Sequence, residues 1–337
     1  MGAGLASDRP AILVTGGAGY IGAHCCRALD AAGYLPVCYD NFSTGHHSFV
    51  AGALVTGDIA DKATLARAFA EHDIVAVMHF AASSLVGESV VDPQKYYVNN
   101  LAGTLALLDA MREAGCSRLV FSSTGAVYGN ADSKALPENY PCAPINPYGA
   151  SKWMIERVLS DYRGAYGLGS FALRYFNASG ADPAGGIGEQ REVETHLIPR
   201  AMMALQGHVP DFAVFGDDYA TPDGTAIRDY IHVTDLAAAH VLALKLLLEG
   251  HSGGVFNLGT GKGFSVREIL AAIASETGRE VPHVVKPRRA GDPTYLVADA
   301  SAARETLHFR PAYSDLATII RTAWAWHKKA HPLKTGE

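Results

Sequence analysis

The stretch that decides the fold is residues 11–22, AILVTGGAGYIG. It begins with a short apolar run that ends abruptly in glycine, which predicts a buried parallel strand. Gly16, Gly19 and Gly22 follow with Gly-x-x-Gly-x-x-Gly spacing. The first glycine allows a tight turn, the second lets the backbone approach a pyrophosphate, and the third lets a helix pack against the strand. The segment therefore predicts a strand, a phosphate-binding turn and a helix whose positive N-terminal end faces the phosphate.

An acidic residue follows this unit at the end of a second predicted strand. The strand runs from Pro36 to Tyr39, and Asp40 comes directly after it, 18 residues beyond Gly22. A carboxylate at this spacing accepts hydrogen bonds from both hydroxyls of an adenosine ribose, and it repels a 2′-phosphate. The sequence therefore favours NAD over NADP, whereas the plainer alternative is a glycine-rich turn beside a surface aspartate.

The alternation of short apolar runs and helical segments continues along the first half of the chain. The next predicted strands are 54–56, 74–80, 118–122 and 169–175, and the predicted helices between them are 63–70, 93–114 and 148–166. Strands separated by helices indicate an α/β protein with a doubly wound parallel sheet of the Rossmann type. Ligands of such a sheet bind outside the carboxyl ends of its strands. We therefore expect the residues that follow these ends to meet in one crevice: Gly16, Asp40, Asp58, Ala81 and Thr124.

The rhythm of strands and helices stops after Asn177, where a segment rich in glycine and proline begins. A smaller α/β domain that binds the substrate is expected beyond this point, interleaved with the first domain. We expect a NAD-binding domain over residues 10–178, with returns to its sheet near 229–258, and a discontinuous second domain over 179–331. The predicted returns are the helix 233–248 and the strand 255–258.

The segment between residues 121 and 152 carries the candidate chemistry. Tyr148 and Lys152 are four residues apart, so on a helix they share one face, about 6 Å from each other. An ammonium at this distance favours the phenolate, yet a tyrosine base needs its pKa lowered by roughly 3 units from 10 to work at neutral pH. A second positive charge, such as an oxidised nicotinamide ring, would supply the remainder. Thr124 adds a hydroxyl nearby. The alternative is that Tyr-x-x-x-Lys is a chance pattern of packing and a solvated amine.

Composition excludes several other classes of protein. The 337 residues carry a net charge of −6 and no basic block longer than two or three residues, so non-specific nucleic-acid binding is not expected. Five cysteines form no C-x-x-C pattern, which argues against a disulfide framework or a metal site and fits a reducing cytoplasm. The longest apolar stretch, residues 236–248, is too short to cross a membrane.

The second domain contains cations that suit an anionic ligand. Arg228 lies in TAIRDYIHV, and Arg288 and Arg289 lie in PRRAGD. Arginine forms forked hydrogen bonds to phosphate oxygens, and Phe215 could stack on a base. The alternative is that these arginines form surface salt bridges with Asp229 and Asp292.

Taken together and in order, these motifs resemble a known family. They are TGGAGYIG, Asp40-Asn41, GDI, HFAA…VGESV, YYVNN, SSTGAVYG, PYGASK, LRYFNASGA, IRDYIHVTDLA, FNLGTG and RRAGD. Over residues 11–331 the chain is similar to the UDP-glucose 4-epimerases of the extended short-chain dehydrogenase/reductase family. The resemblance implies tightly held NAD, a UDP-hexose substrate, a homodimer and the interconversion of UDP-galactose and UDP-glucose at C4 through a 4-keto sugar.

The resemblance also implies roles for individual residues. Tyr148 falls on the base, Lys152 on its supporting lysine and Thr124 on a hydroxyl that bonds the sugar. The residues expected to contact the cofactor are Gly16, Gly19, Tyr20, Ile21, Gly22, Asp40, Asn41, Asp58, Ile59, Phe80, Ala81, Ala82, Asn99, Ser122, Tyr148, Lys152 and Tyr175. Those expected to contact the UDP-sugar are Thr124, Asn177, His196, Leu197, Phe215, Arg228, Tyr230, Val266, Arg289 and Asp292.

The sequence departs from the family pattern at three positions, and the one at Leu296 leaves the exact substrate open. Ser84 stands where some members have a lysine that reaches the cofactor, and His196 replaces an asparagine. Leu296 stands where either a large tyrosine or a small residue limits the sugar pocket, so a UDP-N-acetylhexosamine or a UDP-pentose is an alternative substrate. A 4,6-dehydratase is less favoured because Gly125 and Ala126 occupy the positions of its extra acid. A non-catalytic NAD sensor is the alternative from another class.

Overall fold

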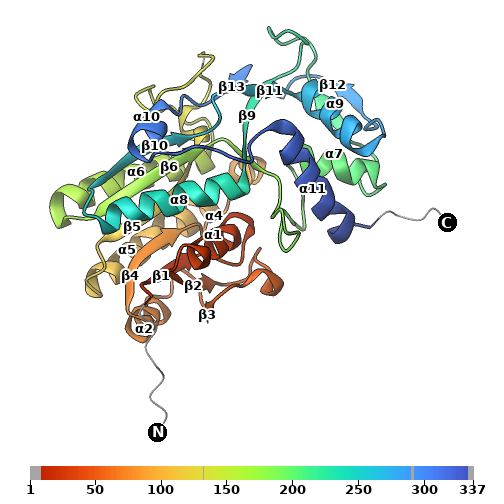
Figure 1. Cartoon of the computed structure of the whole chain (residues 1–337). Coiled ribbons are helices and arrows are strands. Elements are labelled where there is room, and N and C mark those ends of the chain that lie inside the picture. The colour runs from red at the N-terminus through yellow and green to blue at the C-terminus, as the bar shows by residue number, and fades with distance from the viewer. Residues whose placement is uncertain (1–8, 132, 290–291, 333–337) are drawn as a thin grey trace.

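The computed structural model of the chain describes residues 9–131, 133–289 and 292–332. Its larger lobe is built on one parallel sheet, and a smaller lobe beside it carries helices α7, α9 and α11 (Figure 1). These three helices span Leu197–Leu205, Val266–Thr277 and Leu316–Ala330.

Seven strands form the main sheet, in the order β10-β6-β5-β4-β1-β2-β3, and every neighbouring pair is parallel. Their bounds are β1 Ala11–Thr15, β2 Leu35–Asp40, β3 Ala53–Thr56, β4 Ile74–His79, β5 Arg118–Thr124, β6 Gly169–Tyr175 and β10 Gly253–Leu258. The chain runs outward from β1 through β2 to β3 and then crosses back to β4, so the strand order reverses between β1 and β4. This confirms the doubly wound sheet and places its ligand crevice at that reversal.

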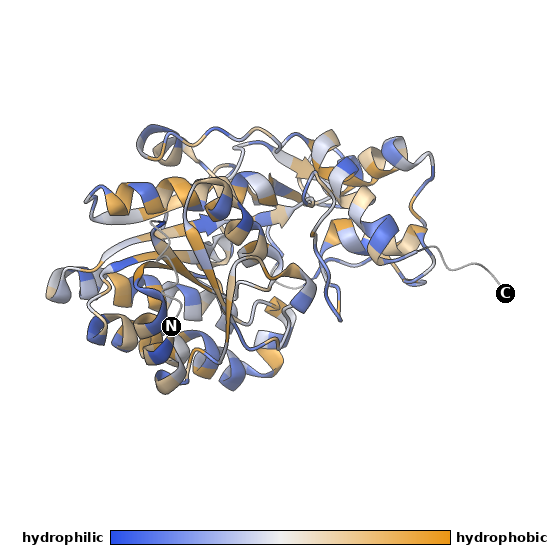
Figure 2. Ribbon diagram, turned by 60° about the horizontal axis from the view of Figure 1, so that its bottom comes forward, coloured by the Kyte–Doolittle hydropathy of each residue, from blue (hydrophilic) through white to orange (hydrophobic). Residues whose placement is uncertain are grey.

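Helices cover both faces of the sheet, and each face has its own hydrophobic core. On one face, α1 (Tyr20–Ala31) packs against α8 (Val233–Leu248), with α10 (Ser301–Thr306) beside β10. On the other face lie α2 (Lys62–His72), α5 (Gly103–Glu113) and α6 (Pro147–Tyr166). The strands alternate strictly: Ile12 and Val14 face the first core, and Leu13 faces the second. Figure 2 shows these strands as apolar bands between helices whose outer faces are polar.

The two returns to the sheet lie where the sequence predicts them. β10 pairs with β6 in parallel register, and α8 packs on α1. The segment from α10 also returns to the larger lobe, which the sequence reading did not include. The chain therefore passes between the lobes more often than the predicted boundaries suggest.

One predicted helix is not a single α-helix. Residues 93–114 form three consecutive segments: α4 (Pro93–Tyr96), a π-helix, η2 (Tyr97–Ala102), and α5. The wider π turn directs Asn100 into buried contacts, where its amide donates to the Ser83 carbonyl at 3.0 Å and to Ser151 Oγ at 3.1 Å. Hydrophobic spacing does not reveal a π turn this short, because six residues are too few to show the change in period.

The smaller lobe contains two short sheets. One has the order β11-β9-β13 with β7 also paired to β9, and the other joins β12 to β8. Their bounds are β7 Asn177–Ser179, β8 Ala213–Phe215, β9 Ile227–His232, β11 Gly263–Ser265, β12 Val284–Lys286 and β13 Tyr295–Leu296. β7 follows β6 almost at once and leads the chain from the main sheet into this lobe. None of the helices in the described part of the chain combines the length and apolar character that a bilayer crossing needs.

Candidate active site

The three candidate catalytic residues lie on two rigid elements that meet at the carboxyl end of the sheet. Thr124 is the last residue of β5, and Tyr148 and Lys152 lie in the first turns of α6. Asn146 caps this helix by accepting a hydrogen bond from the Gly149 N–H at 2.8 Å, and a proline occupies its first turn. The cap fixes where the helix begins and so places Tyr148 beside Thr124.

The surroundings of Tyr148 have opposing effects on the pKa of its phenol. The pKa of its phenol is raised, because burial outweighs the opposing effects of a hydrogen bond with the Thr124 hydroxyl and the positive charge of Arg191. The Thr124 oxygen already accepts from the Ala126 N–H at 3.1 Å, so its proton is available to donate to the phenol oxygen. Tyr148 is thus hydrogen-bonded in the sense that favours its ionised form.

Lys152 lies on the same helix face, and its ammonium is bound. The side chain is 3% exposed, and Nζ donates to the Ser122 carbonyl at 2.8 Å. Burial lowers the pKa of this lysine to about 7, partly offset by Glu156. The sequence assigns to Lys152 the lowering of the Tyr148 pKa. This role of Lys152 stays a prediction.

A buried ion pair fixes α6 on the sheet directly beneath these residues. Arg174 on β6 pairs with Glu156 on α6 at 2.6 Å, and both side chains are almost completely buried. Ser123 on β5 donates to the same carboxylate. Because the pair joins α6 to two strands one turn after Lys152, it holds the reactive face of the helix in register with the strand ends.

The glycine turn has the close contacts that its spacing predicts. Gly16 has φ +73°, and a Cβ there would lie 2.7 Å from the Ala81 nitrogen. A Cβ on Gly22 would lie 2.1 Å from the Gly16 oxygen, so only glycine lets α1 approach β1. Asp40 Oδ2 accepts from the Ala18 N–H at 2.9 Å, which ties the end of β2 to this turn. The predicted residues at the ends of β1, β2 and β4 are therefore side by side.

The other predicted cofactor residues surround the same edge. Asp58 bonds the Asn41 amide at 2.8 Å, and the Tyr175 hydroxyl bonds Ser122. The Phe80 N–H donates to the Thr15 carbonyl at 2.8 Å. Asn99 donates to Asn100 at 3.0 Å and belongs to the π-helix. Three more lie on neighbouring stretches of chain: Tyr20 and Ile21 at the start of α1, and Ile59, buried after β3.

Two predicted nucleotide contacts in the smaller lobe already have protein partners. Arg228 forms an ion pair with Asp292 at 2.5 Å, and the guanidinium of Arg289 lies 3.9 Å from the ring centre of Phe215. The salt bridge to Asp292, which the sequence offered as the alternative to phosphate binding, is thus present for Arg228. The pairing with Asp229 is wrong, because Asp229 is buried and accepts from the backbone of Thr260, Gly261 and Ala298.

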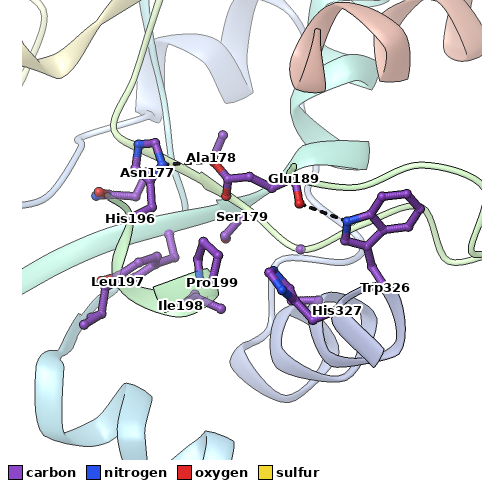
Figure 3. A pocket seen from close by; sticks show the side chains of 13 residues that line it. Asn177, Ala178, Ser179, Glu189, His196, Leu197, Ile198, Pro199, Trp326 and His327 are labelled. Carbon is purple, nitrogen blue, oxygen red and sulfur yellow. Dashed lines mark hydrogen bonds and ion pairs between the residues drawn. The ribbon is translucent and has the colours of Figure 1, made fainter. Parts of the chain in front are cut away.

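Four further predicted substrate residues line one cavity between β7, β9 and the start of α7 (Figure 3). They are Asn177, His196, Leu197 and Tyr230. Asn177 Nδ2 donates to the Asp229 carbonyl at 2.9 Å, which joins β7 to β9. Val266, the last of the predicted set, begins α9, and its N–H donates to the Ala226 carbonyl at 3.2 Å.

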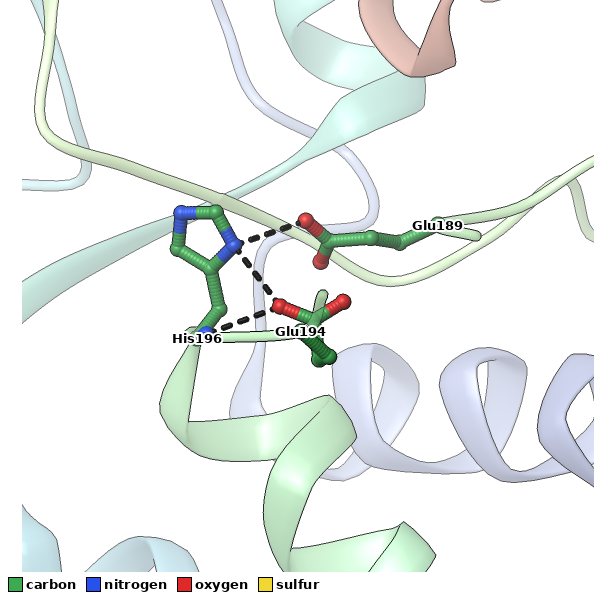
Figure 4. Close-up of side chains that lie close together, drawn as sticks. All are labelled: Glu189, Glu194 and His196. Carbon is green, nitrogen blue, oxygen red and sulfur yellow. Dashed lines mark hydrogen bonds and ion pairs between the residues drawn. The ribbon is translucent and has the colours of Figure 1, made fainter. Parts of the chain in front are cut away.

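The loop before α7 contains a charged cluster that sequence reasoning missed. His196 Nδ1 lies 2.9 Å from a Glu189 oxygen and 3.1 Å from a Glu194 oxygen (Figure 4). Burial alone would lower the pKa of His196, but the two carboxylates raise it to about 10. Arg191 donates to Glu189 at 3.1 Å. The only signal in the sequence is the dense run of charges, EQREVETH, which is also typical of a solvated loop.

The donor atoms of this cluster lie within 4.8 Å of one another, a spacing that also suits a metal ion. A metal ligand, however, must be a neutral imidazole. Here the histidine sits between two carboxylates that hold it protonated, and both carboxylates are already paired. The cluster is therefore explained as an ionic network within the protein.

With this geometry described, the chain can be compared with known proteins. Residues 12–259 match the profile of the NAD dependent epimerase/dehydratase family. The chain belongs to this family. It is 52% identical over 319 residues to a UDP-glucose 4-epimerase of Rhizobium meliloti (strain 1021), covering 94% of this chain and 97% of the relative.

Solved structures of family members have the same fold. The UDP-glucose 4-epimerase of Brucella ovis, in complex with NAD, matches with a TM-score of 0.92 and 55% identity, over 94% of this chain and 97% of that one. The enzyme of Stenotrophomonas maltophila, with bound NAD and formylated UDP-arabinopyranose, matches with a TM-score of 0.93 and 41% identity, over 96% and 99%. The expected family and the two-lobe α/β fold are confirmed.

Proposed function

We propose that this family member is a NAD-dependent UDP-glucose 4-epimerase that interconverts UDP-galactose and UDP-glucose through a 4-keto sugar. Its nearly full-length similarity to enzymes of this name supports the proposal. The observation that carries it is the meeting of Thr124, Tyr148 and Lys152 at the carboxyl end of β5, the strand beside β4, with no carboxylate at positions 125 and 126. A dehydratase needs such an acid to expel water, so a simple oxidation and reduction at one carbon fits better.

The residues at the strand ends fit NAD. A side chain at Gly16 would collide with the backbone of Ala81, and α1 begins at Tyr20, directly after the turn, so its N-terminus is suited to a pyrophosphate. Asp40 accepts one backbone N–H on each oxygen, from Ala18 and Phe42, so each oxygen keeps a lone pair for a ribose hydroxyl. When bound here, NAD would supply a hydride acceptor and donor for the sugar C4.

The protein groups move the proton and hold the sugar. Tyr148, as phenolate, takes the proton of the 4-hydroxyl and later returns it. Thr124 donates a hydrogen bond to the phenol oxygen and orients it toward the sugar. Lys152, whose Nζ donates to the Ser122 carbonyl, would also hold the nicotinamide ribose.

The smaller lobe anchors the UDP moiety while the keto sugar turns. Arg228 and Arg289 supply cations for the diphosphate, and the nucleotide must draw Arg228 from Asp292 and Arg289 from the face of Phe215. This binding energy is remote from C4, so it holds the substrate without resisting rotation of the sugar. We propose the domain division accordingly: a NAD domain over 10–178 with returns near 229–258, and a UDP-sugar domain over 179–331.

The choice of sugar depends on Leu296. Its side chain packs with Tyr128, Tyr140 and Phe176 in a small cluster beside the turn that follows Thr124. The second candidate is a related UDP-sugar, either an N-acetylhexosamine or a pentose. Leucine is smaller than tyrosine but larger than glycine, so it leaves a pocket of intermediate size. A panel of UDP-sugars, assayed with the native protein and with Leu296→Tyr, separates the candidates.

We also propose a cytoplasmic homodimer. Helix α3 (Val86–Val91) packs against α6, and their outer faces expose Val90, Val91, Trp153 and Met154. The resemblance suggests a dimer through the helices that begin at Pro93 and near Tyr148, but Leu108 and Leu159 on these helices are buried against the sheet. The five cysteines are free thiols in the structure, which suits a reducing compartment.

The experiment that tests the function uses the purified protein without added cofactor. Incubation with UDP-galactose is expected to yield UDP-glucose, because the NAD is regenerated in each turnover and need not leave. A 4-keto-6-deoxy product would instead indicate a dehydratase, and the absence of any product would indicate a sensor or scaffold.

A further inference from the structure

The loop that joins β7 to α7, residues 180–196, lies between the two lobes and next to α1 (Figure 1). Its Gly180 carbonyl accepts a hydrogen bond at 2.7 Å from the hydroxyl of Tyr20, the first residue of α1. Its Gln190 carbonyl lies 3.0 Å from Nε2 of His46, on the loop after β2. Two contacts thus tie this loop to the segments that follow β1 and β2.

Arg191, on the same loop, reaches the segment that follows a third strand. Its Nη1 lies 3.5 Å from the Ser84 hydroxyl, on the loop after β4. Its Nε donates to Glu189 at 3.1 Å, which sets the direction of the guanidinium. The side chain is 27% exposed, and no group in the described part of the chain bonds its Nη2. The guanidinium is therefore held along one edge and keeps donors for a ligand.

The contact with Ser84 places this cation at the reversal of strand order. β1 and β4 are neighbours in the sheet, and a Cβ on Gly16 would lie 2.7 Å from the Ala81 nitrogen, so the glycine turn touches the loop on which Ser84 lies. In a doubly wound sheet, the strand ends at such a reversal enclose the dinucleotide. Arg191 therefore reaches the site that fits NAD from the loop before α7.

The segments that follow these strands supply no cation of their own. Residues 16–22, 41–46 and 80–85 contain neither lysine nor arginine. Lys152 is 3% exposed, and its ammonium is bonded to a carbonyl of β5. Backbone N–H groups and the N-terminus of α1 carry only partial positive charges. A full positive charge beside a dinucleotide diphosphate must therefore come from another part of the chain.

We propose that Arg191 binds the diphosphate of NAD, with Glu189 and Ser84 orienting its guanidinium. Arginine suits this role because its planar fork bonds two phosphate oxygens and stays charged at any pH at which the protein works. The family to which the chain belongs is NAD dependent. Of the proposed function the inference takes only the binding of NAD, and it does not depend on which sugar reacts.

A UDP-sugar also carries a diphosphate, but the contacts of Arg191 favour the cofactor. The loop 180–196 touches the segments after β1, β2 and β4, whereas the arginines proposed for UDP, Arg228 and Arg289, lie on and beyond β9 in the smaller lobe. The test therefore measures NAD and UDP separately.

The test uses the purified protein with its bound NAD and follows exchange with isotope-labelled NAD by mass spectrometry. Arg191→Met removes the charge, and Arg191→Lys keeps it with fewer donors. Arg27→Met is the matched control, because Arg27 pairs from the middle of α1 with Asp182 of the same loop at 2.8 Å. This control loosens the loop and leaves Arg191 in place.

A double variant separates the charge from the structure of the loop. Ser84→Lys, added to Arg191→Met, supplies a cation from the other side of the contact between these two residues. A lysine at position 84 restores a positive charge beside the diphosphate, yet it does not restore the bond from the loop to Glu189.

In Arg191→Met, exchange of NAD is expected to become roughly 10- to 100-fold faster, the range for the loss of a charge-assisted hydrogen bond. The exchange rate should also depend less on ionic strength than in the native protein. Arg191→Lys and the double variant should each recover part of the loss, and Arg27→Met should exchange at the native rate. The Kd of UDP, from calorimetric titration of the same proteins, should stay native in Arg191→Met.

Native exchange in Arg191→Met, equally fast exchange in Arg27→Met, or a double variant that recovers nothing overturns the inference. Weakened UDP binding with native NAD exchange would assign the cation to the sugar nucleotide and overturn it as well. If Arg191→Met does not fold, Arg191→Gln carries the same prediction, because it keeps a donor for Glu189. A native protein that retains NAD but has no epimerase activity refutes only the proposed function, and NAD exchange still tests Arg191.

Discussion

In the larger lobe, the reactive side chains lie on a strand end and a capped helix that buried contacts hold in place. In the smaller lobe and the loop before α7, the cations are held by acidic side chains. Thr124 and Tyr148 already bond one another, whereas Arg228 is paired with Asp292 and Arg191 with Glu189. The first region is complete without a ligand. The second keeps its charges neutralised, and Arg228 must exchange its partner when a diphosphate arrives. The first region therefore holds the reactive side chains in fixed positions, and the second, called the capture region below, binds the diphosphate by exchanging ion-pair partners.

Removal of the phenol hydroxyl has the largest expected effect, because it acts where the first region does its chemistry. Tyr148→Phe should fold and retain NAD but lose roughly 10³-fold in kcat, the usual contribution of a positioned base. Tyr166→Phe, at the far end of the same helix, is the matched control. Steady-state rates and the NAD released on denaturation provide the measurements. Near-native turnover in Tyr148→Phe would exclude it as the base.

The buried ion pair between Glu156 and Arg174 tests whether α6 is held rigidly on the sheet. Glu156→Gln leaves Arg174 buried without a countercharge and should lower the free energy of unfolding by about 3–5 kcal/mol. Urea unfolding measures the change. Asp161→Asn breaks an exposed pair on the same helix and should change stability by less than about 1 kcal/mol. If both variants unfold alike, the buried pair does not fix the helix.

A substitution in the capture region should change the affinity for UDP much more than the free energy of unfolding. Arg228→Met removes charge-assisted bonds worth about 1.5–3 kcal/mol, so KM and the Kd of UDP should rise roughly 10- to 100-fold while kcat changes less. Calorimetric titration with UDP and urea unfolding give the two readouts. A large loss of stability with native UDP affinity would reverse the comparison between the two regions.

The pH dependence of the loop cluster is the smallest expected effect. The pKa of His196 is raised to about 10 in the folded protein, from an unfolded value near 6.5. Its contribution to stability is therefore complete below about pH 6.5 and disappears as the pH rises through about 10. The stability difference between the native protein and His196→Asn should decline across this window in urea unfolding. A difference that stays constant with pH would show that His196 is not held protonated.

How much could be predicted from the sequence also differs between these two regions. The main strands and the two returns follow from apolar runs and their spacing, and the glycine turn follows from sterics, because only glycine fits at Gly16 and Gly22. The π-helix at Asn100 was missed because hydrophobic period does not report hydrogen-bond register. The ionic cluster of Glu189, Glu194 and His196 was missed because it depends on how the loop before α7 folds, which no local pattern encodes. Asp229 was misassigned because a buried aspartate bonded to backbone looks, in sequence, like any partner for a neighbouring arginine.

The measurement that tests the central claim most directly follows the hydrogen at C4. UDP-galactose labelled with deuterium at C4 is incubated with the protein without added cofactor, and the UDP-glucose formed is analysed by NMR and mass spectrometry. The account predicts UDP-glucose that keeps the deuterium at C4, because the same hydride leaves and returns within one closed site. Product with hydrogen from solvent at C4, or no product from folded protein that contains NAD, would contradict it.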